Sequence, residues 1–159
     1  MSKTKKTNAM RTLDRWKVDY ELLSYDTSDG KIDGISVAQK VAKEVTVVYK
    51  TLVTQGNSKE FYVFVIPVDK ELDLKKAAAA CGEKKVEMIA LKDILKYTGY
   101  MRGGCSPLGM KKVYKTFVDQ SAMNIEKIII SAGKIGMQIE LRVEDLLEIT
   151  PAVSEKLIK

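Results

Sequence analysis

A glycine-rich segment with basic residues around it is the part of this sequence best suited to contact an anion. The segment TGYMRGGCSPLGMKK, residues 98–112, holds four of the ten glycines and one of the two cysteines, and no acidic residue occurs between Ile94 and Val118. Adjacent Gly103 and Gly104 would let the backbone approach a ligand closely, and their N–H groups could stabilise an oxyanion. The same glycines could equally form a plain turn between a helix and a strand.

The glycine spacing does not match the common nucleotide-binding loops. It fits neither G-x-x-x-x-G-K-[ST] nor G-x-G-x-x-G. A second turn of small residues, SAGKIG at residues 131–136, also carries a lysine and is equally consistent with a hairpin connection. These two turns indicate a binding site only if the fold brings them together.

Lys50 is the one charged residue in the segment VTVVYKTLVTQ, residues 45–55. On the two-residue period of a strand it shares a face with Val48, Leu52 and Thr54. If that face borders a cleft, the ammonium could bind a phosphate or orient a carbonyl oxygen. The alternative is an ordinary lysine on the wet face of a strand or on an edge strand.

The sequence contains no histidine, which excludes Ser-His-Asp and Cys-His nucleophile systems and every histidine-containing zinc site. Cys105 could act as a nucleophile only if a lysine or a helix N-terminus lowered its pKa. We expect no metal and no other cofactor.

The length and composition favour one domain over residues 1–159, with residues 1–6 as a basic arm. The 159 residues are 45% apolar, and the formal net charge of +6 favours encounter with a polyanion such as nucleic acid. Two distant cysteines are typical of a protein from the reducing cytoplasm. No apolar run is long enough to span a membrane, and the N-terminus lacks the apolar core of a signal peptide.

Apolar periodicity predicts the elements that must position these residues. An amphipathic helix with a basic outer face is expected over residues 5–17, followed by a polar loop at 25–34. Ser36 and Gln39 form a capping box that predicts a helix through Lys43. The apolar face of the first helix consists of Ala9, Met10, Leu13 and Trp16.

Two segments rich in β-branched residues, 45–55 and 61–68, flank Gly56-Asn57-Ser58 and predict a hairpin. Other strands are expected at 85–89, 115–120, 126–133 and 137–141, and other helices at 74–81 between Asp73 and Gly82, at 91–99 and at 143–158. Helices and strands alternate without strict βαβ repetition. The predicted fold class is therefore α/β, with helices around one mixed sheet.

Five segments together carry a resemblance to a known family. They are YKTLV (49–53), PVDKELDLKKAA (67–78), KKVEM (84–88), TGYMRGGCSPLGMKK (98–112) and SAGKIG (131–136). In order and spacing they resemble the YbaK/EbsC family of aminoacyl-tRNA deacylases, from about Tyr25 to the final helix. The domain is also similar to the editing insertion of bacterial prolyl-tRNA synthetases.

The resemblance implies a single α/β (α+β) domain with a curved, barrel-like mixed sheet, and an editing enzyme that acts in trans on mischarged tRNA. The expected substrate is Cys-tRNA(Pro), with Cys-tRNA(Cys) as a further substrate. The substrate's own thiol would attack its ester carbonyl and release a thiolactone and free tRNA. The alternatives are an Ala-tRNA(Pro)-type deacylase and a catalytically silent module that binds tRNA or a synthetase. Expected partners are tRNA(Pro) and prolyl-tRNA synthetase, with no membrane.

Carried over by position, the family's essential lysine corresponds to Lys50 and its carbonyl-facing glycine to Gly103. The resemblance assigns substrate binding to Tyr25, Thr51, Gly104, Ser131, Gly133 and Gln138. Gly133 is expected to let its turn pass close to the ligand. Two positions depart from the family pattern: Asp33 replaces an aromatic residue, and Gln138 replaces an aspartate found in some members.

Contacts with the tRNA phosphates are expected from basic residues of the first helix and of residues 102–115. The candidates in the second segment are Arg102, Lys111, Lys112 and Lys115.

Overall fold

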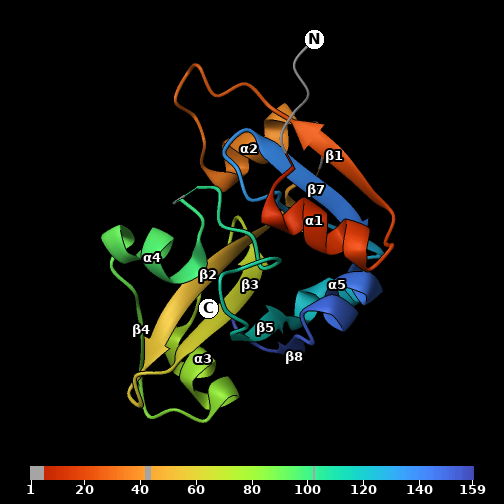
Figure 1. The fold of residues 1–159 in the computed structure, drawn as a ribbon. Helices are drawn as coiled ribbons and strands as arrows, with labels where there is room; N and C mark the ends of the chain where they lie inside the picture. Colours follow the sequence, from red (N-terminus) through yellow and green to blue (C-terminus); the bar gives the residue numbers. More distant parts are fainter. Residues whose placement is uncertain (1–5, 42–43, 102) are drawn as a thin grey trace.

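The computed structural model describes residues 6–41, 44–101 and 103–159, which form two β-sheets with helices around them (Figure 1). Residues 1–5 of the arm expected at residues 1–6, the predicted helix end at Lys43 and the predicted tRNA contact Arg102 lie outside the described residues. Among the helices of the described ranges, none is both long and apolar enough to cross a membrane.

The larger sheet has the strand order β4-β2-β3-β5-β8. Its strands are β2 (Tyr49–Gly56), β3 (Phe61–Pro67), β4 (Val86–Met88), β5 (Lys115–Asp119) and β8 (Val153–Glu155). The predicted hairpin is confirmed, because β2 and β3 pair antiparallel. β5 runs parallel to β3 and β8 parallel to β5, so this sheet is mixed.

The smaller sheet consists of β1 (Tyr20–Ser24), β7 (Met137–Arg142) and β6 (Lys127–Ser131), all antiparallel. Strand β1 was not predicted. The expectation of one continuous, barrel-like sheet is wrong, although the mixed α/β class is confirmed: the two sheets stay open and are joined through an isolated bridge between Val48 and Ile129.

The helices are α1 (Asn8–Arg15), α2 (Gly34–Lys40), α3 (Leu74–Cys81), α4 (Ile94–Thr98) and α5 (Val143–Ile149), with 3-10 turns η1 (Val45–Val47), η2 (Leu91–Asp93) and η3 (Gln120–Asn124). The smaller sheet packs on α1 through a core that includes Leu13, Ile128, Ile130 and Ile139. A second core, around Phe64, Ile66 and Phe117, lies between the larger sheet and α3.

Predicted boundaries are wrong at α1, α2 and α5. Helix α1 ends before Trp16, which is 48% exposed and does not belong to the apolar face. Asp33, not Ser36, is the N-cap of α2, because its carboxylate accepts the Ser36 N–H. Helix α5 ends at Ile149, since Pro151 cannot continue a helix, and the tail pairs as β8 instead.

The glycine-rich loop is fixed in place by direct packing against α1. Gly109 has a φ of +69°, and a Cβ at this position would lie 2.6 Å from the carbonyl carbon of Asn8 and 2.9 Å from the Ala9 nitrogen. Because these are backbone atoms of the first helical turn, they cannot move aside as a flexible side chain would. Nearby, the Tyr100 hydroxyl donates a hydrogen bond of 2.6 Å to the Leu108 carbonyl.

We predict that Gly109→Ala destabilises the protein more than Gly82→Ala, which is a matched control. Gly82, at the end of α3, has a similar φ of +74°, but a Cβ added there would have no atom within 4 Å. At Gly82, an alanine in the left-handed backbone conformation should lower the free energy of unfolding by about 1–2 kcal/mol. At Gly109, overpacking against α1 should add a further loss of about 1–3 kcal/mol. Urea denaturation of both variants measures the difference, and equal losses would show that the contact with α1 is dispensable.

Candidate active site

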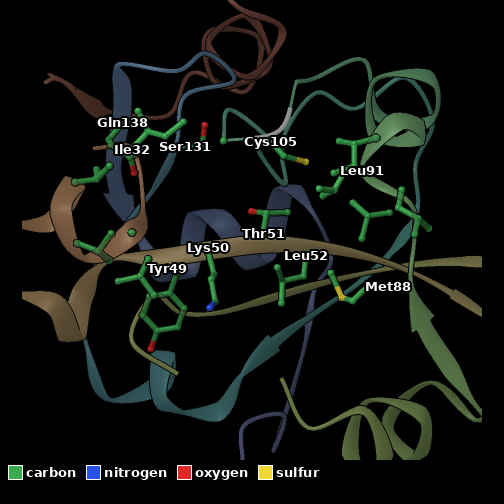
Figure 2. Close-up of a pocket in the computed structure, with 18 of the residues that line it drawn as sticks. Ile32, Tyr49, Lys50, Thr51, Leu52, Met88, Leu91, Cys105, Ser131 and Gln138 are labelled. Atoms are coloured by element: carbon green, nitrogen blue, oxygen red, sulfur yellow. The ribbon is translucent and has the colours of Figure 1, made fainter. Parts of the chain in front are cut away.

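A cavity of about 610 Å³ opens beside strand β2, between the two sheets and the glycine-rich loop (Figure 2). Its other walls come from α2 and the loop before it, from Val68, from the β4–η2 connection, from Gly103 and Cys105, and from the adjoining ends of β6 and β7. Ile32, Ser131 and Gln138 lie at one end of the view in Figure 2, and Met88 and Leu91 lie at the other. The cavity therefore has a partly polar end and an apolar end.

Six of the eight residues predicted for catalysis and substrate binding line this cavity. They are Tyr25, Lys50, Thr51, Gly103, Ser131 and Gln138. These six residues belong to separate motifs that are far apart in the sequence, and the fold brings them together in one cavity. Gly104 and Gly133 do not line it.

Lys50 is the one charged side chain among the described residues that line the cavity. No carboxylate contributes to the lining, and among the described residues the Lys50 side chain has no hydrogen-bond or ion-pair partner. An ammonium without a counter-ion in a concave site attracts the oxygen atoms of a ligand, because few protein charges offset it. In Figure 2, Lys50 and Thr51 leave β2 on opposite sides, with Thr51 directed towards Cys105 and Ser131.

Two buried hydroxyl groups of the cavity have no hydrogen-bond partner: Tyr25 Oη and Thr51 Oγ1. The Tyr25 side chain is only 9% exposed. A buried polar atom without a partner costs about 1–3 kcal/mol, and such atoms are few in folded proteins. Two of them in one cavity are the pattern expected where a polar ligand completes the hydrogen bonding.

Ser131 and Gln138 face each other across β6 and β7, where they are register partners. The Ser131 hydroxyl accepts the Gly133 N–H at 3.1 Å, so its own hydrogen is still available for donation. Gln138 is 6% exposed. Together they offer the cavity neutral donors and acceptors and no titratable group.

The backbone of β2 also faces the cavity. Val68 N–H donates to the Val48 carbonyl in the hairpin, and Ile89 N–H donates to the Val53 carbonyl on the opposite edge of β2. Since backbone groups alternate between the two edges of an antiparallel strand, those of Thr51 point to the same edge as those of Val53. Strand β4 pairs with β2 only from Thr54 to Gly56, so this edge is open at Thr51.

Cys105 lines the cavity as a protonated thiol. Burial raises its pKa to about 12. At neutral pH the thiolate fraction is therefore very small, and the thiolate is the form that attacks a carbonyl. The raised pKa therefore disfavours the nucleophile alternative for this residue.

The predicted site glycines have different surroundings. Gly103, with a φ of +83°, borders the cavity beside Ile32. Gly104 donates its N–H to the Met101 carbonyl at 2.9 Å, and a Cβ there would lie 3.0 Å from the Ile135 nitrogen. Gly104 therefore makes a packing contact between the loop and the backbone of the 131–136 turn, and the substrate contact expected of it stays a prediction.

The role expected of Gly133 likewise stays a prediction, because its nearest contact is with the protein itself. Its φ is +94°, and a Cβ would lie 2.6 Å from Cε1 of Tyr100. The missing side chain makes room for this ring. The two small-residue turns do meet in space, but through packing of protein against protein.

The loop before α2 is held by Lys40, which the sequence did not single out. Lys40 Nζ donates to the Asp26 carbonyl at 2.6 Å, to Asp29 Oδ1 at 2.7 Å and to the Lys31 carbonyl at 2.9 Å. These three bonds fix the loop that carries Ile32 into the cavity wall. No sequence signal marked Lys40, because a lysine in the last turn of a short helix is common.

The sequence also provided no signal for the apolar end of the cavity. Met88 and Leu91 are 47% and 57% exposed, although their sequence patterns are those of an ordinary strand and helix. Of the predicted tRNA contacts, Lys111, Lys112 and Lys115 lie outside the cavity lining, on the surface of the molecule.

Comparison with known proteins connects this cavity to a family. The profile of the aminoacyl-tRNA editing domain matches residues 32–149. A protein of Enterococcus faecalis, provisionally named Cys-tRNA(Pro)/Cys-tRNA(Cys) deacylase EbsC, is 50% identical over 145 residues, which cover 91% of this chain and 88% of that protein.

Two solved structures share the fold. One is provisionally described as a trans-editing enzyme for prolyl-tRNA synthetase. It has a TM-score of 0.84 at 20% identity, and the match covers 98% of this chain and 99% of that chain. The other, a hypothetical protein, has a TM-score of 0.87 at 21% identity, and the match covers 96% of this chain and 100% of that protein's chain. With the matched profile and the EbsC relative, they lead to one conclusion: this chain belongs to the aminoacyl-tRNA editing domain family.

Proposed function

We propose that this protein is an aminoacyl-tRNA deacylase that removes cysteine from mischarged tRNA(Pro). The observation that supports the proposal most strongly is the character of the cavity. It holds one unpaired ammonium, several neutral donors and a protonated thiol, but no carboxylate among its described residues. The sequence has no histidine either. Such a site can position and polarise an ester, but it has neither a general base nor a nucleophile of its own.

A cysteinyl ester supplies the missing nucleophile. Its thiol sulfur attacks the ester carbonyl carbon, so a C–S bond forms and the C–O bond to the terminal ribose breaks. The thiol proton ends on the ribose oxygen, and the products are a thiolactone and free tRNA. Holding sulfur and carbonyl at reacting distance raises their effective concentration, which can account for much of the rate acceleration.

Lys50 and Gly103 would stabilise the reacting carbonyl group. In this proposal the Lys50 ammonium binds the ester carbonyl or the terminal ribose-phosphate, and the Gly103 N–H points at the developing oxyanion. The unpartnered hydroxyls of Tyr25 and Thr51 gain partners when the substrate binds. Ser131 and Gln138 complete the polar end of the cavity.

The choice of cysteine over alanine rests on the name of the EbsC relative and on the mechanism, since a pocket of this type distinguishes small apolar groups by only about 1–3 kcal/mol. Asp33, one of the two departures from the family pattern, is used as the cap of α2 and does not line the cavity. Gln138, the other, does line it. An Ala-tRNA(Pro)-type specificity is the competing function.

The reaction would take place in the cytoplasm, on a single editing domain formed by the whole chain. Prolyl-tRNA synthetase would present the tRNA, and Lys111, Lys112 and Lys115 would contact its phosphates.

We predict that Lys50→Ala slows deacylation of Cys-tRNA(Pro) by about 10²–10³-fold, the range found when a donor to an oxyanion is removed. The assay measures release of free tRNA from cysteinyl and alanyl esters. Lys75→Ala, which changes an exposed residue of α3, is the control and should match the wild type. If the wild type cleaves neither ester, the protein is a binding module without deacylase activity. If it cleaves the alanyl ester preferentially, the competing Ala-tRNA(Pro) specificity is favoured.

We also predict that Cys105→Ser retains activity, because the thiol is protonated and the reacting sulfur belongs to the substrate. Serine keeps the size and polarity of the side chain but is a far weaker nucleophile. Single-turnover rates of the two proteins on Cys-tRNA(Pro) provide the measurement. A loss of more than about tenfold, roughly 1.4 kcal/mol in the barrier, would restore Cys105 as a catalytic residue.

A further inference from the structure

A second hollow, separate from the active-site cavity, lies between the end of α1 and the glycine-rich loop. Its volume is about 340 Å³, and α5 contributes the far wall through Ile149 and the adjoining Thr150. Its described lining includes no acidic residue but contains two cations and two aromatic rings. We call this hollow the Trp16 groove; the four residues are Arg15, Trp16, Lys112 and Tyr114.

The Trp16 ring is exposed although its backbone is firmly held. The Trp16 N–H donates to the Thr12 carbonyl at 3.1 Å, and the next residue, Lys17, turns the chain with a φ of +56°. One turn earlier, Leu13 is fully buried and anchors the helix. A large aromatic ring that is 48% exposed on a fixed backbone is a ready surface for stacking.

The charges beside the ring are available to an anionic ligand. Arg15 and Lys112 are exposed and form no ion pair with another residue of the described ranges. Asp14, the acidic residue of α1, is not part of the lining and is ion-paired with Lys6. Cations beside an exposed aromatic ring, without carboxylates, are the combination that binds single-stranded nucleic acid.

The groove and the active site are built on the same loop. Cys105 lines the catalytic cavity, whereas Pro107, two residues later, lines the groove. The contact of Gly109 with Asn8 fixes the loop against the helix that carries Trp16 at its end (Figure 1). The cavity and the groove are therefore lined by neighbouring residues of one loop.

We propose that the Trp16 groove binds an unpaired nucleotide of the aminoacyl-tRNA, with its base stacked on Trp16 and its phosphates contacted by Arg15 and Lys112. This inference rests on the proposed function and deepens it, since it assigns a second recognition site for the same substrate.

Tryptophan fluorescence tests this directly, because Trp16 is the only tryptophan of the chain. Titration with uncharged tRNA(Pro) should quench the fluorescence in a saturable way, whereas heparin, a polyanion without bases, should not. Filter binding should show that Trp16→Ala weakens tRNA affinity about tenfold, within the range for one base–aromatic stack. Trp16→Phe should recover part of that loss, and Lys75→Ala should leave affinity unchanged.

Binding of tRNA without a change in fluorescence, or equal affinity of Trp16→Ala and wild type, would overturn the proposal. Quenching by prolyl-tRNA synthetase but not by tRNA would overturn it too, by assigning the groove to a protein partner. Turnover of cysteinyl-adenosine by the wild type tests the proposed function separately, because this ester is too small to need the groove. Quenching by tRNA without turnover of cysteinyl-adenosine would refute only the proposed deacylase function. Turnover without quenching would refute only the proposed nucleotide binding at the Trp16 groove.

Discussion

The position of the glycine-rich loop depends on close backbone contacts at two of its glycines. Gly104 lies against the backbone of Lys134 and Ile135, and Gly109 lies against the first turn of α1. Side chains at these positions would push the loop away from both neighbours. The contacts thus hold Gly103 at the cavity and keep α1 beside the loop, so one packing constraint supports both the catalytic cavity and the Trp16 groove.

The chemistry of the cavity follows from what its lining provides. Lys50 supplies positive charge, and Tyr25 and Thr51 supply hydroxyls that have no partner within the described residues. The thiol of Cys105 stays protonated because burial raises its pKa. A reaction in which the substrate brings its own nucleophile needs positioning and electrostatic stabilisation, and these are what the lining offers.

Much of the fold and site could be predicted from local patterns. The β-branched runs predicted the β2–β3 hairpin, and the motif resemblance located Lys50, Thr51 and Gly103, which line one cavity. The division into two sheets could not be predicted, because it depends on long-range packing around strands such as β6. The packing roles of Gly104 and Gly133 could not be predicted either, since a glycine that admits a ligand and one that admits a neighbouring chain segment look identical in sequence.

The proposed mechanism requires the substrate, not the protein, to supply the nucleophile. The most direct measurement compares single-turnover deacylation of tRNA(Pro) carrying cysteine with that of tRNA(Pro) carrying S-methylcysteine, which keeps the sulfur but cannot cyclise to a neutral thiolactone. We expect rapid release of tRNA from the cysteinyl ester, with a thiolactone as the first product, and little release from the methylated ester. Similar rates for both esters would contradict the mechanism, because they would require a nucleophile from the protein or from water.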